Sequence, residues 1–321
     1  MKKFQFLALT AVLATAAATT NAQIFIEDFE TGAGSSANFT VTENLGAGVT
    51  LTGTNSVVFG FDYGAHVNST GIDIDIPTAP NSAASTTTGL QVAVNTGTTA
   101  TGETAVNIYP NLPSALPQNY KFQFDVYGNY ATDNTDTTTE YLQWGAAGSN
   151  TDVLFARSPS IPESGANGNA FGTTLEGGAG TDAVYATGSG DPITFNNALA
   201  GWPGSTADAF WTAAIPVDPE IALAIAGEGS FKWITVELVV DQSLSIANVF
   251  FTTTIGRTTP VTSPRALVAS NVPLQGDATN PFVGLYDRFS SLGGVDTFIV
   301  IDNIIITDET VSSTELWNLY N

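Results

Sequence analysis

The chain has 321 residues, no cysteine and a formal net charge of −22 at pH 7, although only 12% of its residues are charged. The absence of cysteine excludes disulfides, thiol catalysis and cysteine-ligated metals. A surface this negative repels phosphate backbones, which argues against a nucleic-acid partner.

The N-terminus has the order of a secretory signal peptide. Lys2 and Lys3 precede an apolar stretch from Phe4 to Ala18, and small residues follow as far as Ala22. This order predicts a signal over 1–22 with cleavage near Ala22. The alternative is a membrane anchor, but the apolar run is shorter than the roughly 20 residues that span a bilayer. The sequence therefore predicts a secreted protein, extracellular or periplasmic, with no membrane insertion.

After the signal, apolar and polar residues alternate with period two between turn-forming residues, which is typical of strands. Ten segments fit this pattern best. They are 24–29, 37–42, 56–63, 89–95, 120–128, 139–147, 231–241, 246–256, 281–289 and 296–307. One helix is predicted at 218–227, with an edge strand or a loop as the alternative. Many strands with so little helix predict an all-β fold.

Residues 159–209 are rich in Gly, Ala and Asn and have weak periodicity. We interpret them as a loop-rich insertion, with a few short strands, in a single β-sandwich that spans 23–321. A linker between two domains is the alternative.

The closing segment FIVIDNIIIT (298–307) is apolar at almost every position but holds Asp302 and Asn303 in its middle. A strand that is apolar at both parities is covered on both faces. We therefore expect it to pair centrally beside 24–29, which would bring Asp302 close to Glu27 and Glu30. Buried carboxylates that lie close together need a cation or hydrogen-bond donors between them.

Three segments resemble concanavalin A-like jelly-roll domains of secreted bacterial proteins: IFIEDFE (24–30), FKWITVELVVD (231–241) and VGLYDRFSSL…FIVIDNIIIT (283–307). The resemblance implies a sandwich of two antiparallel sheets whose opening and closing strands pair. It also implies a structural calcium ion where the terminal strands meet. It does not choose a function, because this fold hosts lectins, glycosidases, lyases and structural modules.

The sequence predicts no catalytic residue. An E-x-D pair, which would place two carboxylates on one strand face, occurs nowhere. Asp73 and Asp75 would share a face, but we interpret them as a solvated strand face. The one histidine, His66, is interpreted as a loop residue without a chemical role.

Calcium is the predicted cofactor because it prefers carboxylate and carbonyl oxygens. The first candidate site is the terminal cluster of Glu27, Glu30 and Asp302. The alternative is the turn that carries Asp133, Asp136 and Glu140, where Asp residues also serve simply as turn formers.

Sugar binding requires exposed aromatic rings and planar hydrogen-bonding groups. Trp202, Trp211, Tyr127 and Tyr130 lie in or beside predicted loops and are the candidate ligand-binding residues. Trp233 is expected in the core, and the position of Trp144 is left open.

The leading hypothesis is a non-catalytic extracellular module that binds a polysaccharide or a cell-surface glycan. The alternatives are a self-associating structural protein of the cell surface or matrix, and a glycoside hydrolase whose carboxylates come from different strands.

Overall fold

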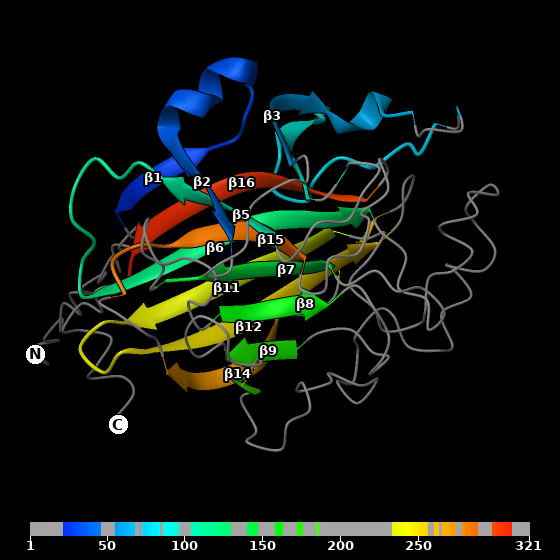
Figure 1. Cartoon of the computed structure of the whole chain (residues 1–321). Helices are drawn as coiled ribbons and strands as arrows, with labels where there is room; N and C mark the ends of the chain where they lie inside the picture. Colours follow the sequence, from blue (N-terminus) through cyan, green and yellow to red (C-terminus); the bar gives the residue numbers. More distant parts are fainter. Residues whose placement is uncertain are drawn as a thin grey trace, which may run out of the picture.

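The chain forms two antiparallel sheets that pack face to face (Figure 1). The computed structural model describes residues 22–45, 55–67, 71, 73–83, 86–94, 96, 104–129, 140–146, 158–162, 172–175, 184–185, 233–255, 260–262, 265–273, 278–287 and 297–309. The signal segment 1–21 and the predicted helix 218–227 lie outside these residues, as does most of the insertion 159–209. No helix in the described part of the chain is long and apolar enough to cross a membrane.

Nine strands form sheet A. In order across the sheet they are β13 (Val261–Thr262), β12 (Ile246–Ile255), β11 (Trp233–Asp241), β6 (Asn119–Asn129), β16 (Phe298–Asp308), β4 (Thr88–Ala93) and β3 (Ser56–Asp62); β1 (Gln23–Glu27) also pairs with β16, and β14 (Ala266–Pro273) with β12.

Seven strands form sheet B. Their order is β10 (Val184–Tyr185), β9 (Gly172–Leu175), β8 (Ser158–Pro162), β7 (Glu140–Gly145), β15 (Phe282–Asp287), β5 (Thr104–Pro110) and β2 (Phe39–Leu45). Two short 3-10 helices, η1 (Gly32–Asn38) and η2 (Tyr63–Ala65), follow β1 and β3.

The chain passes back and forth between the sheets. Read from one edge, β3, β4, β16 and β6 occupy the same places in sheet A as β2, β5, β15 and β7 occupy in sheet B. Each strand of the first set is the chain neighbour of its counterpart in the second. This winding is that of a jelly roll, and it confirms the two-sheet antiparallel sandwich expected from the resemblance.

All ten predicted strands are present, with boundaries shifted by at most a few residues. β5, β14 and the two-residue β13 were not predicted. Short strands β8 to β10 lie in or at the edge of the loop-rich segment. The predicted pairing of the terminal strands is confirmed, because Glu27 of β1 lies opposite Ile304 of β16.

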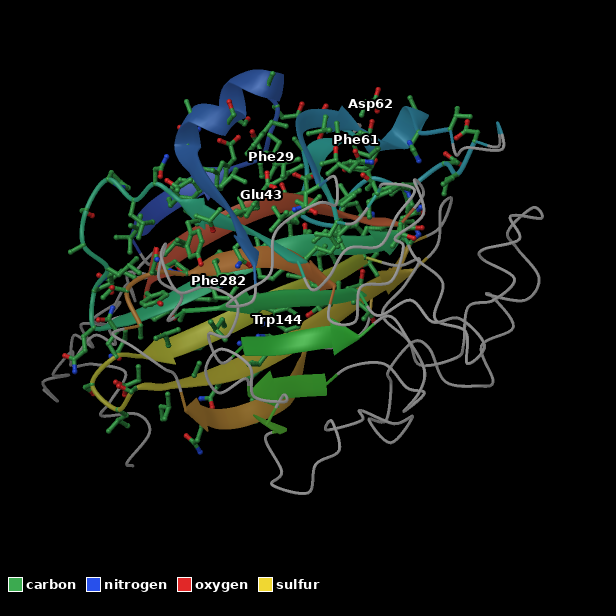
Figure 2. All side chains as sticks on the ribbon, in the orientation of Figure 1. Phe29, Glu43, Phe61, Asp62, Trp144 and Phe282 are labelled. Carbon is green, nitrogen blue, oxygen red and sulfur yellow. The ribbon has the colours of Figure 1, made fainter. Side chains whose placement is uncertain are left out.

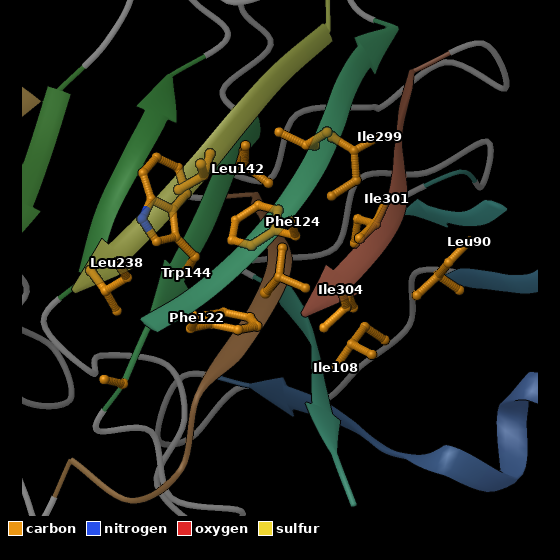
Figure 3. Close-up of a cluster of buried hydrophobic side chains, with 14 of the residues drawn as sticks. Leu90, Ile108, Phe122, Phe124, Leu142, Trp144, Leu238, Ile299, Ile301 and Ile304 are labelled. Atoms are coloured by element: carbon orange, nitrogen blue, oxygen red, sulfur yellow. The ribbon is translucent and has the colours of Figure 1, made fainter. Parts of the chain in front are cut away.

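The main core fills the space between the sheets, because alternate residues of each strand point inward. Phe124 of β6 contacts Trp144 of β7 edge to face, with ring centroids 6.1 Å apart, and Trp144 also contacts Phe251. Figure 3 shows Ile299, Ile301 and Ile304 of β16 in the same cluster. Trp144, left open above, is therefore a core residue with no exposed surface.

A second apolar cluster lies on the other face of sheet A. The described residues within 63–87, between β3 and β4, cross this face, and we call them the strap. Tyr63, Ile74, Ile76 and Ala79 of the strap are buried against a set of sheet residues: Tyr127, Trp233, Phe298 and Val300. β16 is thus covered on both faces, as its apolar sequence predicted. Trp233 is buried, as expected.

Candidate functional site

The pair Asp302-Asn303 sits at a β-bulge in the middle of β16. The register with β6 runs from Asp302 opposite Asp125 to Ile305 opposite Gln123, which leaves one extra residue on β16. The extra residue is accommodated at Asn303, which has a positive φ of 52°. Asn adopts this conformation more readily than most residues with a side chain. The bulge brings the side chains of both Asp302 and Asn303 into contact with the strap residue Ser82.

This bulge also marks a change of neighbour for β16. Ile299 to Ile301 pair with β4, whereas Ile304 to Thr307 pair with β1. The Asp-Asn pair lies between these two stretches. There the Asp302 carboxylate accepts a hydrogen bond from the backbone N–H of Asn303 at 2.8 Å. The polar pair Asp302-Asn303 of this apolar strand therefore lies where the pairing of β16 changes from β4 to β1.

Two carboxyl groups face each other across neighbouring strands under the strap. Asp302 of β16 lies directly opposite Asp125 of β6, and Asp125 lies opposite Thr235 of β11. Asp125 and Asp302 are 0% and 1% exposed. A buried carboxyl pair is stable only if donors or a shared proton compensate for the lost water.

Asp125 accepts four hydrogen bonds. Its Oδ1 accepts from Thr235 Oγ1 at 2.6 Å and from Asn81 Nδ2 at 2.8 Å. Its Oδ2 accepts from Asn303 Nδ2 at 2.9 Å and from the backbone N–H of Asn81 at 3.1 Å. Because three of these donors cannot act as acceptors, the contacts favour an ionised Asp125.

Asp302 has a different set of partners. Its Oδ2 accepts from Ser82 Oγ at 2.8 Å and from Tyr63 Oη at 3.1 Å. Both partners are hydroxyls, which can rotate and act as donor or acceptor. Asp302 is therefore the member of the pair that can carry a proton without losing these contacts.

Burial raises the pKa of both carboxyl groups. Desolvation is the main cause that raises the pKa of Asp302 to about 7, and the charge of Asp125 adds to this rise. The hydrogen bonds from Ser82, Asn303 and Tyr63 lower the pKa of Asp302 and so oppose the rise. Desolvation also raises the pKa of Asp125, against its hydrogen bonds from Thr235, Asn303 and Asn81. The donor sets assign the proton to Asp302, because its partners can reverse their hydroxyls and most of those of Asp125 cannot.

The strap also rests on an aromatic layer beside the carboxyl pair. The rings of Tyr63 and Tyr127 lie 5.3 Å and 5.5 Å from that of Trp233, measured between centroids. Trp233 Nε1 donates to the carbonyl of Pro77 at 2.6 Å. In Figure 2, Phe61 and Asp62 mark the end of β3 at which the strap begins.

We expect Tyr63→Phe to loosen the strap. The Tyr63 hydroxyl accepts the backbone N–H of Ala79 at 3.1 Å, and the phenylalanine would leave that buried N–H without this acceptor. A stranded buried donor costs about 1–3 kcal/mol. The free energy of unfolding in urea should fall by that amount, and a loss below about 0.5 kcal/mol would contradict the role given to this hydroxyl.

Beyond the strap, no other described segment covers the same face of sheet A. One row of directly paired residues crosses six strands from β1 to β14, and we call it the transverse row. It consists of Ile26, Ile305, Gln123, Glu237, Phe250 and Leu267. Ile26 and Leu267 at its ends are 58% and 49% exposed, and the residues between them are half-buried.

Charged side chains fix the middle of the transverse row. Glu237 forms a hydrogen-bonded ion pair with Arg265 at 2.9 Å and a longer ion pair with Lys121 at 3.8 Å. The Arg265 guanidinium lies 3.4 Å from the centre of the Phe250 ring, in a cation–π contact. The row therefore presents planar polar groups beside apolar surface.

The terminal calcium cluster does not form. No group of three acidic or histidine side chains that could hold a metal ion occurs among the described residues. Glu27 is buried and accepts from Phe29 N–H, Ser35 Oγ and Asn38 Nδ2 at 2.6–3.0 Å, so it organises η1. Glu30 is exposed, and Asp302 belongs to the network under the strap. Protein donors contact the carboxylates of Glu27 and Asp302, and calcium itself stays a prediction.

Tyr127 is not a sugar platform, since it is 2% exposed and packs against Trp233. The other candidate aromatic residues, Trp202, Trp211 and Tyr130, lie outside the described residues. So do Asp133 and Asp136 of the alternative metal site, while Glu140 is described only as the first residue of β7.

Sequence reasoning missed Asp125, Asn81 and Ser82. Asp125 lies at an outward position of a strand, where an exposed acid is the ordinary expectation, and no spacing links it to Asp302. Asp73 and Asp75, expected to share a strand face, lie in the strap. Asp73 forms an isolated bridge with Val67, and Asp75 has a positive φ of 52°. His66 lies between Phe61 and Phe298, in edge contact with both rings.

No protein-family model matches the chain, and no curated protein matches it. Among solved structures it is similar to the GH131 β-glucanase catalytic domain from Podospora anserina, with 12% identity over 71% of this chain and 75% of that one and a TM-score of 0.36. It is also similar to endo-β-1,4-glucuronan lyase from Trichoderma reesei, with 12% identity, coverage of 89% and 96% and a TM-score of 0.37.

A third similar structure is the metal-free form of lectin I-B4 from Griffonia simplicifolia. Its identity is 9%, the coverage is 88% of this chain and 98% of the lectin, and the TM-score is 0.34. The assignment of this chain to a two-sheet sandwich rests on its own strand topology.

Proposed function

We propose that this protein is a non-catalytic module that binds an extended polysaccharide on the part of sheet A beyond the strap. The observation that carries the proposal is the transverse row, which crosses six strands and has an exposed apolar residue at each end. Five steps between strands of about 4.8 Å each make a track of roughly 24 Å. Such a track suits a chain of several sugars rather than one.

The chemistry of the row suits a polyol. Glu237, Gln123 and Arg265 offer planar acceptors and donors for hydroxyl groups, while Ile26, Ile305 and Leu267 offer apolar surface for the C–H faces of sugar rings. The cations Lys121 and Arg265 are both paired with Glu237. Together with the net charge of −22, this pairing favours a neutral polymer over an anionic one.

The non-catalytic assignment rests on the state of the carboxyl pair. Hydrolysis would need two carboxyl groups that flank a sugar bond. Asp125 and Asp302 face each other on this same side of the sheet, but they are buried under the strap and engaged by seven hydrogen bonds in all. We place the protein outside the cell, on the grounds of its N-terminal sequence.

The test is binding of soluble neutral and anionic polysaccharides to the mature protein by calorimetry, with and without calcium, while reducing ends are monitored. We expect a neutral polymer to bind without new reducing ends. Gln123→Ala and Leu267→Ala should each weaken binding about tenfold, which corresponds to about 1.4 kcal/mol. Loss of binding on chelation would support the calcium prediction.

The matched control is Val41→Ala, a similar truncation of a 37% exposed residue on sheet B, which should leave the affinity unchanged. New reducing ends would overturn the non-catalytic assignment. Absence of binding to every polysaccharide, together with oligomers in solution, would favour the self-associating structural protein instead.

A further inference from the structure

The contacts of the Tyr63 hydroxyl indicate that the attachment of the strap depends on protonation, a property that the proposed function does not use. This hydroxyl has two acceptors within reach: Asp302 Oδ2 at 3.1 Å and the carbonyl of Thr86 at 3.4 Å. A hydroxyl has one proton, so it can donate to only one of them at a time. The acceptor of the Tyr63 hydroxyl therefore depends on whether Asp302 carries a proton.

We infer that Asp302 is a pH-sensitive latch: with a proton it fastens the strap to sheet A, and without the proton it weakens the attachment of the described strap residues from Tyr63 to Ser82. The latch is built from the opposed carboxyl groups of Asp302 and Asp125, and from the two rotatable hydroxyls that contact Asp302.

In the fastened state the proton lies on Asp302 Oδ2. From there it donates to Ser82 Oγ or to Tyr63 Oη, and the Tyr63 hydroxyl turns toward the Thr86 carbonyl. Ser82 Oγ can accept from Asp302 as it accepts from Asn303 Nδ2 at 2.9 Å. When the proton is donated to Tyr63 Oη, Ser82 Oγ still donates to Asp302 Oδ2 and every donor in the network has an acceptor. Asp125 is then the single negative charge.

In the released state Asp302 gives its proton to solvent. Two negative charges then face each other across β16 and β6 in a site closed to water, where their repulsion is weakly screened. Opening the strap returns water to both carboxylates. The cost of keeping it closed therefore grows as the solution becomes more alkaline.

The groups around Asp302 make this titration specific. The ionisable neighbours that contact it or share its register are Asp125 on β6 and Tyr63 in the strap. On β4, Gly89 has no side chain that could titrate, and it packs close to this part of β16, since an added Cβ would lie 3.0 Å from the Ile301 carbonyl. β11 contributes the hydroxyl of Thr235, which contacts Asp125. Burial holds the pKa of the Tyr63 hydroxyl far above its usual range, so Tyr63 stays neutral.

The sign of the effect follows from linkage. The pKa of Asp302 is about 7 in the closed state and has the ordinary value for aspartate, about 3.9, when the strap is open. A raised pKa contributes stability that is complete below the lower value and is lost as the pH rises through the higher one. The strap should therefore be most firmly closed in acid and loosen up to about pH 8.

Hydrogen exchange tests this on the mature protein. The readouts are the protection factors of the amides of Ala79 and Asn81, which donate to Tyr63 Oη and Asp125 Oδ2. Corrected for the intrinsic exchange rate, both should fall at least tenfold between about pH 5 and about pH 8. The amide of Asn111, which donates to the Asn38 carbonyl outside the strap, should not follow them.

Asp302→Asn is the decisive variant, because its amide imitates the protonated acid: the oxygen can accept from Asn303 N–H and the NH2 group can donate to the two hydroxyls. The pH dependence of both amides should disappear in this variant. An unchanged pH dependence would overturn the proposal. If the variant does not fold, the 13C carboxyl shift of Asp302 in the unmodified protein decides, since a resonance that does not titrate between about pH 5 and about pH 8 would overturn the latch.

Discussion

Replacement of Asp125 by alanine is expected to lower the free energy of unfolding by about 3–5 kcal/mol. Removing this carboxylate strands four donors at once: Asn81 N–H, Asn81 Nδ2, Asn303 Nδ2 and Thr235 Oγ1. Three of them cannot reverse to become acceptors, and the site is closed to water. The measurement is equilibrium unfolding in urea, followed by tryptophan fluorescence.

The matched variant is Asp302→Ala, in the same network and equally buried. It strands one fixed donor, the Asn303 N–H, while the Tyr63 hydroxyl can turn to the Thr86 carbonyl and the Ser82 hydroxyl can rotate away from the lost carboxylate. We expect it to cost about 1–3 kcal/mol. An Asp302→Ala variant that is less stable than Asp125→Ala would contradict the assignment of Asp125 as the ionised centre of the network.

Gly60→Ala is expected to destabilise the protein by about 2–5 kcal/mol. Gly60 lies at the bulge of β3 between Phe59 and Phe61, with a φ of +75°. A Cβ there would lie 2.6 Å from Gly32 Cα, a backbone atom of η1. The alanine must therefore bear left-handed backbone strain and also push η1 away from β3. Thermal and urea unfolding measure the loss.

Gly71→Ala separates these two causes. Gly71 has a φ of +84°, but nothing lies within 4 Å of the position of its Cβ. The backbone strain alone should cost about 1–2 kcal/mol. If both variants lose the same amount of stability, the close approach of η1 to β3 contributes nothing, and the packing given to Gly60 is wrong.

The sheets of this protein were predictable because most strands alternate clearly. FKWITVELVVD places Ile234, Val236, Leu238 and Val240 at one parity of β11, in the main core, and the turn residues around the segment fix its length. β5 was not predicted, because its sequence TAVNIYP follows a run of Thr and Gly residues that is typical of a loop. The double apolar parity of β16 correctly predicted a strand covered on both faces, and it did so from the sequence of that strand alone.

Of the residues in the site under the strap, only Asp302 could be predicted from the sequence. Asp302 is conspicuous in an apolar strand, but its partner depends on register. The expected pairing of 24–29 with the closing strand predicted Glu27 and Glu30 as the neighbouring acids, whereas the bulge at Asn303 brings Asp302 into contact with the strap, opposite Asp125 of β6. The residues Tyr63 and Asp302 are 239 positions apart in the chain. No local pattern encodes a contact of that range.

The end-to-end arrangement of β1 and β4 along β16 has a consequence for the order of folding. Sheet A has its central strand, β16, near the C-terminus, and β1, β4 and β6 all pair with it. While the chain is being synthesised, these three strands have no partner in the place that β16 will fill. Contacts of such long range make folding slow, and sheet A cannot be completed before β16 has been synthesised.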